Sequence, residues 1–168
     1  MGFGVFAEFA VLLTQLRHIL IAVDLSERSE AVMALEHARL IAPAANITLL
    51  HVVDLPYENQ LVYAGVSQDE IRAYRSNAEY KALAKLHEAS SRIGLDPDRF
   101  TARVLHGEAS REILAHEAAS GCDLLVLGKH GTHVTEELLL GSVTSHVLAQ
   151  SQADVLVIRD TRSPQAHP

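Results

Sequence analysis

The residues best suited to chemistry are glycines and a serine in the last third of the chain. Gly128, Gly131 and Gly141-Ser142 follow an apolar run with the spacing G-x2-G-x9-G-S. Glycine lets backbone N–H groups approach a ligand that a Cβ would exclude, and we expect Gly128 to leave the preceding strand with a positive φ. A helix that begins at Ser142 would offer free N–H groups, a positive dipole end and the Ser142 hydroxyl to a phosphate. The spacing therefore predicts a strand, a phosphate-cradling loop and a helix.

Hydrophobic patterning predicts the elements that position this loop. Buried strands are expected where apolar and β-branched residues run together, at His18–Asp24, Asn46–Val53, Thr101–Leu105, Leu124–Leu127 and Val155–Arg159. Helices are expected between them, at Glu27–Ile41 and Gln68–Ile93, between Ala109 and Gly121, and at Ser142–Ala149. Strands that alternate with helices imply right-handed crossovers and a parallel sheet, so the fold class is α/β.

Capping residues mark several of the expected helix ends. Ser26 is a good N-cap for the first helix, and Pro43 stops that helix. Ser67 and Glu70 have the spacing of a capping box at the start of the longest helix, which Gly94 closes. These local signals agree with the hydrophobic pattern, which supports the predicted boundaries.

Length and charge limit the classes of protein that this chain can belong to. With 168 residues and 48% hydrophobic residues, the chain is long enough for one domain with its own core. A net charge of −7 argues against nucleic acid or an anionic membrane as the main partner. The single cysteine, Cys122, excludes an intrachain disulfide and fits the reducing cytoplasm, which is the expected location.

Residues 1–17 are expected to form an extension of the domain. They are mostly apolar and carry no Lys or Arg before Arg17, so they lack the charged start of a secretory signal. The apolar stretch is also shorter than the roughly 20 residues that cross a bilayer. We therefore favour packing on the domain or on a partner subunit over membrane contact. Residues 161–168 are expected to be a frayed tail.

Several segments together resemble the universal stress protein family. They are the glycine pattern, HILIAVDLS at His18–Ser26, LLHVVD at Leu49–Asp54 and VLVIR at Val155–Arg159. The resemblance covers almost the whole chain, with the family domain at residues 18–160. The glycine pattern is similar to that of the family's ATP-binding branch and sets it apart from the branch that lacks the pattern. The resemblance implies a Rossmann-like fold of the adenine nucleotide alpha hydrolase type, a five-stranded parallel sheet with helices on both faces and strand order 3-2-1-4-5.

That strand order would put strands one and four side by side, where a ligand is expected outside the carboxyl ends. Asp24 and Val52 fall at strand ends there, and the resemblance implies that they contact the nucleotide and the adenine edge, with Ala22 lining the site. From the residues alone, a cap of the following helix is the favoured explanation of Asp24, and the resemblance reverses that preference. The resemblance carries further ribose and phosphate contacts, made mainly through backbone groups, over to Leu127, Gly128, Gly131, Gly141, Ser142, Val143 and Thr144.

The loop departs from the family pattern after Gly131. Members often carry a basic residue there, whereas this chain has Thr132-His133, and we expect Lys129 to supply the charge instead. AMP or ADP would then compete well with ATP. A protein-bound metal at His130 and His133 is not favoured, because no Cys or HExxH accompanies them. Mg²⁺ or Mn²⁺ on the nucleotide phosphates is expected instead.

The expected function is a cytoplasmic, ATP-binding stress-response regulator with little or no turnover. Glu136 and Glu137 are the only acids in the loop, so phosphoryl transfer lacks a convincing base or carboxylate cluster. A slow ATPase at the same residues and a nucleotide-free stress protein are the alternatives. A phosphorylatable receiver is rejected, because strand one offers only Asp24 and strand three runs into His106-Gly107.

The last expected strand, Val155–Arg159, predicts a homodimer. Its apolar residues would leave an exposed edge unless another chain covered it. In the family this strand pairs antiparallel with its copy across a two-fold axis. The resemblance therefore implies a homodimer formed through this strand.

Overall fold

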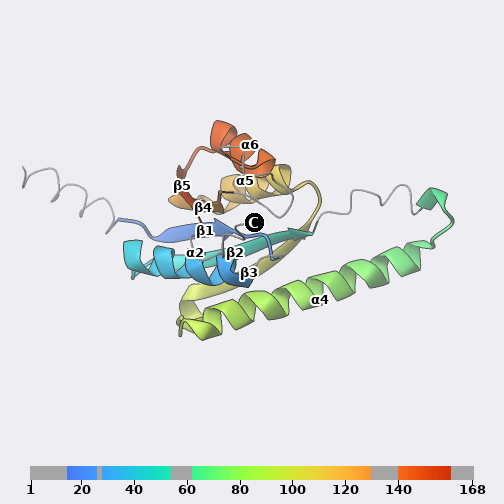
Figure 1. The fold of residues 1–168 in the computed structure, drawn as a ribbon, viewed down its shortest axis with the longest axis horizontal. Helices are drawn as coiled ribbons and strands as arrows, with labels where there is room; N and C mark the ends of the chain where they lie inside the picture. The colour runs from blue at the N-terminus through green and yellow to red at the C-terminus, as the bar shows by residue number, and fades with distance from the viewer. Residues whose placement is uncertain (1–14, 26–27, 54–61, 130–139, 160–168) are drawn as a thin grey trace, which may run out of the picture.

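Within residues 15–25, 28–53, 62–129 and 140–159, which the computed structural model describes, five strands form one parallel sheet (Figure 1). The strands are β1 at His18–Ala22, β2 at Asn46–Val53, β3 at Phe100–His106, β4 at Leu124–Gly128 and β5 at Asp154–Ile158. Their order is β3-β2-β1-β4-β5, and every neighbouring pair is parallel. The expected α/β class and strand order are confirmed.

Helices cover both faces of the sheet, which explains why the central strands are apolar on both sides. They are α2 at Arg28–Ile41, α4 at Gln68–Arg92, α5 at Ala109–Ser120 and α6 at Ser142–Gln150, with a short 3-10 turn at Pro97–Arg99. Helices α2 and α4 cover one face, and α5 and α6 cover the other (Figure 1). None of the described helices is long and apolar enough to cross a membrane.

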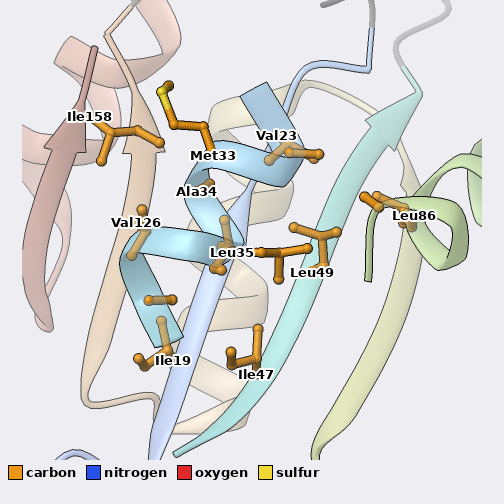
Figure 2. Packing of buried hydrophobic residues seen from close by; sticks show 14 of the residues in the cluster. Ile19, Val23, Met33, Ala34, Leu35, Ile47, Leu49, Leu86, Val126 and Ile158 are labelled. Carbon is orange, nitrogen blue, oxygen red and sulfur yellow. The ribbon is translucent and has the colours of Figure 1, made fainter. Parts of the chain in front are cut away.

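The core consists of two apolar layers, one on each side of the sheet. Successive residues of a strand point to opposite faces. Ile21 of β1 therefore packs on the α2 and α4 side, whereas Leu20 packs on the α5 and α6 side, and both are fully buried. Figure 2 shows the first layer, in which Leu35 of α2 lies over the sheet next to Leu49 of β2. These layers fix the strand ends where the candidate residues lie.

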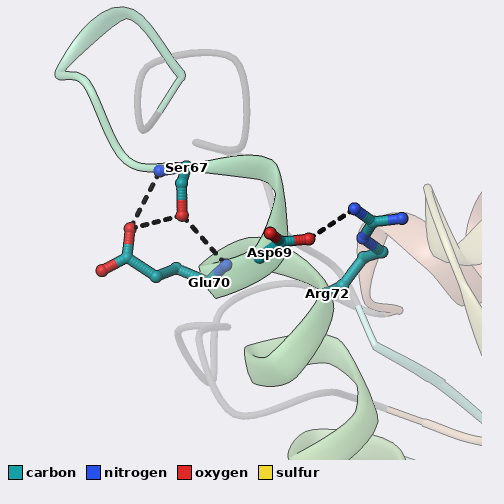
Figure 3. Close-up of polar contacts among 4 residues, drawn as sticks. All are labelled: Ser67, Asp69, Glu70 and Arg72. Carbon is teal, nitrogen blue, oxygen red and sulfur yellow. Dashed lines mark hydrogen bonds and ion pairs between the residues drawn. The ribbon is translucent and has the colours of Figure 1, made fainter.

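The predicted capping box at the start of α4 is confirmed. The Ser67 N–H donates to Glu70 Oε2 at 2.9 Å, and the Glu70 N–H donates to Ser67 Oγ at 3.3 Å (Figure 3). The helix ends at Arg92, and Gly94 follows with a φ of +64°. Helix α2 ends at Ile41, just before Pro43, as expected. The predicted N-cap Ser26 lies outside the described residues.

Candidate functional site

The carboxyl ends of three strands bring the predicted residues to one edge of the sheet. Ala22, the last residue of β1, is level with Leu50 of β2 and Leu127 of β4. Two residues further along each chain come Asp24, Val52 and Lys129. The Val23 N–H continues the β1–β2 pairing by donating to the Leu50 carbonyl oxygen at 2.9 Å. Asp24 is therefore presented just beyond the ordered end of β1, and it is half-buried there.

Backbone hydrogen bonds of Lys129 join the two ends of the glycine loop. Its N–H donates to the Ile158 carbonyl oxygen at 2.7 Å, and its carbonyl oxygen accepts from the Gly141 N–H at 2.9 Å. The Thr144 hydroxyl, which is buried, donates to the Gly128 carbonyl oxygen at 2.8 Å. Three hydrogen bonds thus attach the start of α6 and the edge of β5 to the end of β4. Residues 130–139, which include Gly131, lie outside the described residues.

The N-terminus of α6, next to the bond between Lys129 and Gly141, has backbone N–H donors that are not used within the helix. Gly141 is the N-cap, and within the described part of the chain no side chain caps the helix. The first helical bond runs from the Ser145 N–H to the Gly141 carbonyl oxygen at 2.9 Å. The N–H groups of Ser142, Val143 and Thr144 therefore have no acceptor within the helix. Together with the positive end of the helix dipole they suit an anion.

The expectation of a positive φ at Gly128 is wrong. Gly128 is the last residue of β4 and pairs with Ile158 of β5, so its backbone is still in the strand. The pairing even continues through the Lys129 N–H. Among the described residues, positive φ values occur at Gly65, Gly94, Gly107 and Gly121. The physical reason is that β5 extends the β4 ladder past the point at which a turn was expected.

Other predicted strand ends also shift by one or two residues. Strand β1 ends at Ala22, not at Asp24, because its pairing with β4 stops at Ala22 and only the Val23 N–H continues the backbone pairing with β2. Strand β5 is Asp154–Ile158, so Arg159 lies just past it. The shift leaves Asp24 outside the ladder, at the edge of the sheet.

The remaining predicted residues differ in how far they are buried. The side chains of Ala22 and Leu127 are buried in the core layer under α5 and α6. Val52 is half-buried and packs against the same layer. Ser142 is exposed at the start of α6, and Val143 is half-buried. The structure thus places the predicted residues that it describes at or next to the carboxyl ends of β1, β2 and β4, or at the start of α6.

His51 of β2 is a residue of this edge that the sequence analysis missed. Its Nδ1–H donates to the Val23 carbonyl oxygen at 2.9 Å, next to Asp24. Burial holds the pKa of His51 below its ordinary value, and the charge of Lys85 lowers this pKa further. The hydrogen bond to Val23 and the charge of Asp24 act in the opposite direction and raise it. The signal in the sequence was its position directly before Val52, in the LLHVVD segment. The imidazole thus links β2 to the carbonyl group that directly precedes Asp24.

The described residues contain no group of three or more His, Cys, Asp or Glu side chains that could hold a metal ion. His106, at the end of β3, faces Glu79 of α4 across 3.5 Å. His130 and His133 lie outside the described residues. The donors at the edge are thus backbone N–H groups and single side chains, which suit a phosphate better than a bare cation.

The strand order runs outward in opposite directions from β1 and β4, and a helix with glycine as its N-cap begins next to β4. These features define a Rossmann-like α/β protein. The model of the universal stress protein family matches residues 15–159. The chain belongs to the universal stress protein family.

Individual relatives agree with this assignment. The chain is 29% identical over 138 residues to universal stress protein YxiE of Bacillus subtilis (strain 168), covering 82% of this chain and 86% of the relative. It is 27% identical over 160 residues to universal stress protein MJ0577 of Methanocaldococcus jannaschii, covering 88% and 97%.

Solved structures share the fold. A structure of MJ0577 matches with a TM-score of 0.69 at 26% identity, over 88% of this chain and 98% of that chain. A universal stress protein solved in complex with cAMP matches with a TM-score of 0.54 at 19% identity, over 85% and 96%. At that identity, the second likeness concerns the fold alone.

Proposed function

We propose that this chain binds an adenine nucleotide at the carboxyl edge between β1 and β4, and that it acts as a cytoplasmic stress-response regulator with little or no turnover. The observation that carries the proposal is the bond between Lys129 and Gly141. It places the unused N–H groups of α6 directly beside the end of β4. ATP is the first candidate ligand, and AMP and ADP are its competitors.

The phosphates are assigned to the loop and to the start of α6. The N–H groups of Ser142, Val143 and Thr144 would donate to them, with the exposed Ser142 hydroxyl as a further donor. Lys129, which is half-buried at the same place, would add positive charge. Gly131 would let the loop backbone approach the phosphates. A divalent ion such as Mg²⁺ or Mn²⁺ would accompany the nucleotide through its phosphates.

The nucleoside is assigned to the strand ends. The Asp24 carboxylate would accept hydrogen bonds from the ribose hydroxyls, because it stands beyond the β1 ladder. The backbone of Val52 would meet the adenine edge, with Ala22 and the backbones of Leu127 and Gly128 beneath it. In the sheet register Ala22 is level with Leu127 of β4 and with Leu50 of β2, two residues before Val52. One nucleotide could therefore touch both the strand ends and α6.

The partner is proposed to be a second copy of this chain. Strand β5 is an edge of the described sheet, and Val155, Leu156 and Val157 are only half-buried although they are apolar. An exposed apolar edge is a ready site for pairing with another strand. Antiparallel pairing of β5 with its copy would cover it. We therefore propose a homodimer through β5.

Identification of the bound ligand tests the central proposal. Mass spectrometry of ligand released from the purified protein, with calorimetric titration of ATP, ADP and AMP, should detect an adenine nucleotide. Asp24→Ala should weaken binding while the circular dichroism spectrum stays unchanged, since Asp24 stands outside the core. Release of phosphate from ATP at a measurable rate would favour the slow ATPase. If no adenine nucleotide binds, the proposed function is wrong and the nucleotide-free stress protein is favoured.

A further inference from the structure

Two hydrogen bonds join Val23, the residue directly after β1, to β2. The Val23 N–H donates to the Leu50 carbonyl oxygen, and the Val23 carbonyl oxygen accepts from His51 Nδ1–H, each at 2.9 Å. The second bond comes from a side chain, not from the sheet. It is made at the peptide group that joins Val23 to Asp24. The direction in which the chain presents Asp24 therefore depends on the imidazole.

The imidazole is neutral at neutral pH. A carbonyl oxygen can only accept, so the proton of the neutral ring lies on Nδ1 and Nε2 carries none. Burial lowers the pKa of His51, and the ammonium of Lys85, on α4, lowers it further. The Asp24 carboxylate acts in the opposite direction. The second proton therefore reaches Nε2 only below the ordinary histidine value of about 6.5.

Among the residues that the structure describes, Asp24 and Lys85 are the charged groups that act on this ring. The Lys85 ammonium is held close by, donating to the Leu25 carbonyl oxygen at 3.4 Å. The residue level with His51 on β3 is Val104, and α2 packs this face of the sheet with apolar residues such as Leu35. Asp24 is thus the anion that a protonated ring would attract.

We propose that His51 is the positioning residue for Asp24 and makes nucleotide binding dependent on protonation. The inference rests on the proposed function and deepens it. In the neutral state the ring donates to the Val23 carbonyl oxygen and carries no charge that attracts the Asp24 carboxylate, which would accept from a ribose. In the protonated state the ring is a cation whose charge acts on that carboxylate, and it would compete with the ribose for it. Affinity for an adenine nucleotide should therefore fall as the pH falls through the pKa of His51.

Two variants separate positioning from protonation. His51→Asn keeps an N–H donor close to the place of Nδ1–H but cannot take up a proton. His51→Ala removes both. His37→Asn is the matched control, because His37 Nδ1 bonds to the Met33 carbonyl oxygen at 2.8 Å within α2. It is the same kind of bond and the same substitution at a position on the surface of the helix.

The experiment is calorimetric titration of each protein with AMP at about pH 7.5 and about pH 5.5, on either side of the ordinary histidine pKa. Thermal unfolding at both pH values checks the fold. At the higher pH, His51→Ala should bind about fivefold more weakly than wild type, the effect of one lost hydrogen bond, and His51→Asn should restore most of the affinity. At the lower pH, wild type and His37→Asn should lose more affinity than His51→Asn. Protonation of AMP itself is common to all four proteins and cancels.

Each other result overturns the inference in a recognisable way. Equal pH dependence in wild type and His51→Asn would mean that His51 does not couple protons to binding. If lowering the pH strengthens AMP binding by wild type relative to binding by His51→Asn, the protonated His51 would be a cation that attracts the phosphate. Full affinity in His51→Ala would remove the positioning role. If wild type binds no adenine nucleotide at either pH, the proposed function fails and the inference fails with it.

Discussion

The Lys129 carbonyl oxygen accepts a hydrogen bond from the Gly141 N–H at 2.9 Å, although 11 residues separate them in the chain. The bond sets the start of α6 against the end of β4. The N–H groups that α6 leaves unused therefore open at the same edge as Asp24 and Val52. If this geometry serves a phosphate, substitutions at the glycines should affect binding far more than folding.

Replacement of the loop glycines by valine should weaken ATP binding. Gly141 has a φ of −65°, which any residue adopts, so a side chain there would act through its bulk near the ligand. We expect Gly141→Val and Gly131→Val each to lose at least ~1.4 kcal/mol, about tenfold in affinity, by calorimetry. Ser142→Ala should lose less, on the order of 1 kcal/mol for one hydrogen bond. Far-UV circular dichroism should stay near that of wild type.

The order of these effects is the test. If both valine variants bind ATP as wild type does, the glycines serve only the geometry of the chain. The protein would then be placed with the branch of the family that does not hold nucleotide.

The features that could be predicted from the sequence are those that neighbouring residues encode. The capping box of Ser67 and Glu70 spans three residues, and each strand is a continuous apolar run, so local chemistry was sufficient. Strand order required the family resemblance, because periodicity does not reveal which strands pair. The conformation of Gly128 was mispredicted because it depends on pairing with Ile158, 30 residues further along the chain. His51 was missed for the same reason: its role depends on Val23, 28 residues away.

Glu117 of α5 shows how far such distant contacts determine the fold. The carboxylate is buried, and its Oε1 accepts from the Gln152 N–H at 2.7 Å, the Ala153 N–H at 2.8 Å and the Ser151 hydroxyl at 3.0 Å. These donors form the turn between α6 and β5. One side chain thus holds the segment that begins the proposed dimer strand.

Glu117→Ala should destabilise the protein by about 3 kcal/mol, because three hydrogen bonds to a buried carboxylate are lost, at about 1 kcal/mol each. Urea unfolding followed by circular dichroism measures the change. Glu88→Ala, at an exposed position of α4, is the control and should change the free energy of unfolding by less than about 0.5 kcal/mol. A Glu117→Ala variant as stable as the control would contradict a structural role for these bonds.

The thiol of Cys122 should be unreactive in the folded protein. Burial, with a contribution from the Glu117 carboxylate, raises the pKa of Cys122 from its ordinary value of 9.0 to about 11. The thiolate is the reactive form, so a thiol reagent at about pH 8 should react only after unfolding. The raised pKa also favours the folded state below pH 9.0, and this stabilisation should be lost as the pH rises towards about 11. Rapid labelling of the native protein at about pH 8 would show that the thiol is accessible.

The edge strand β5 gives the prediction for assembly. Val157 is level with Leu127 of β4 and is half-buried in the single chain, so another chain could complete its burial. Val157→Lys would place a charge in a β5–β5 interface and should give a monomer by light scattering, because burying an unpaired charge is costly. Leu148→Lys, at an apolar residue of α6 that is 45% exposed, makes the same chemical change away from the edge. It should remain dimeric, and both variants should keep the circular dichroism spectrum of wild type. A full dimer in Val157→Lys would place the interface elsewhere, and a monomeric wild type would remove β5 as a dimer strand.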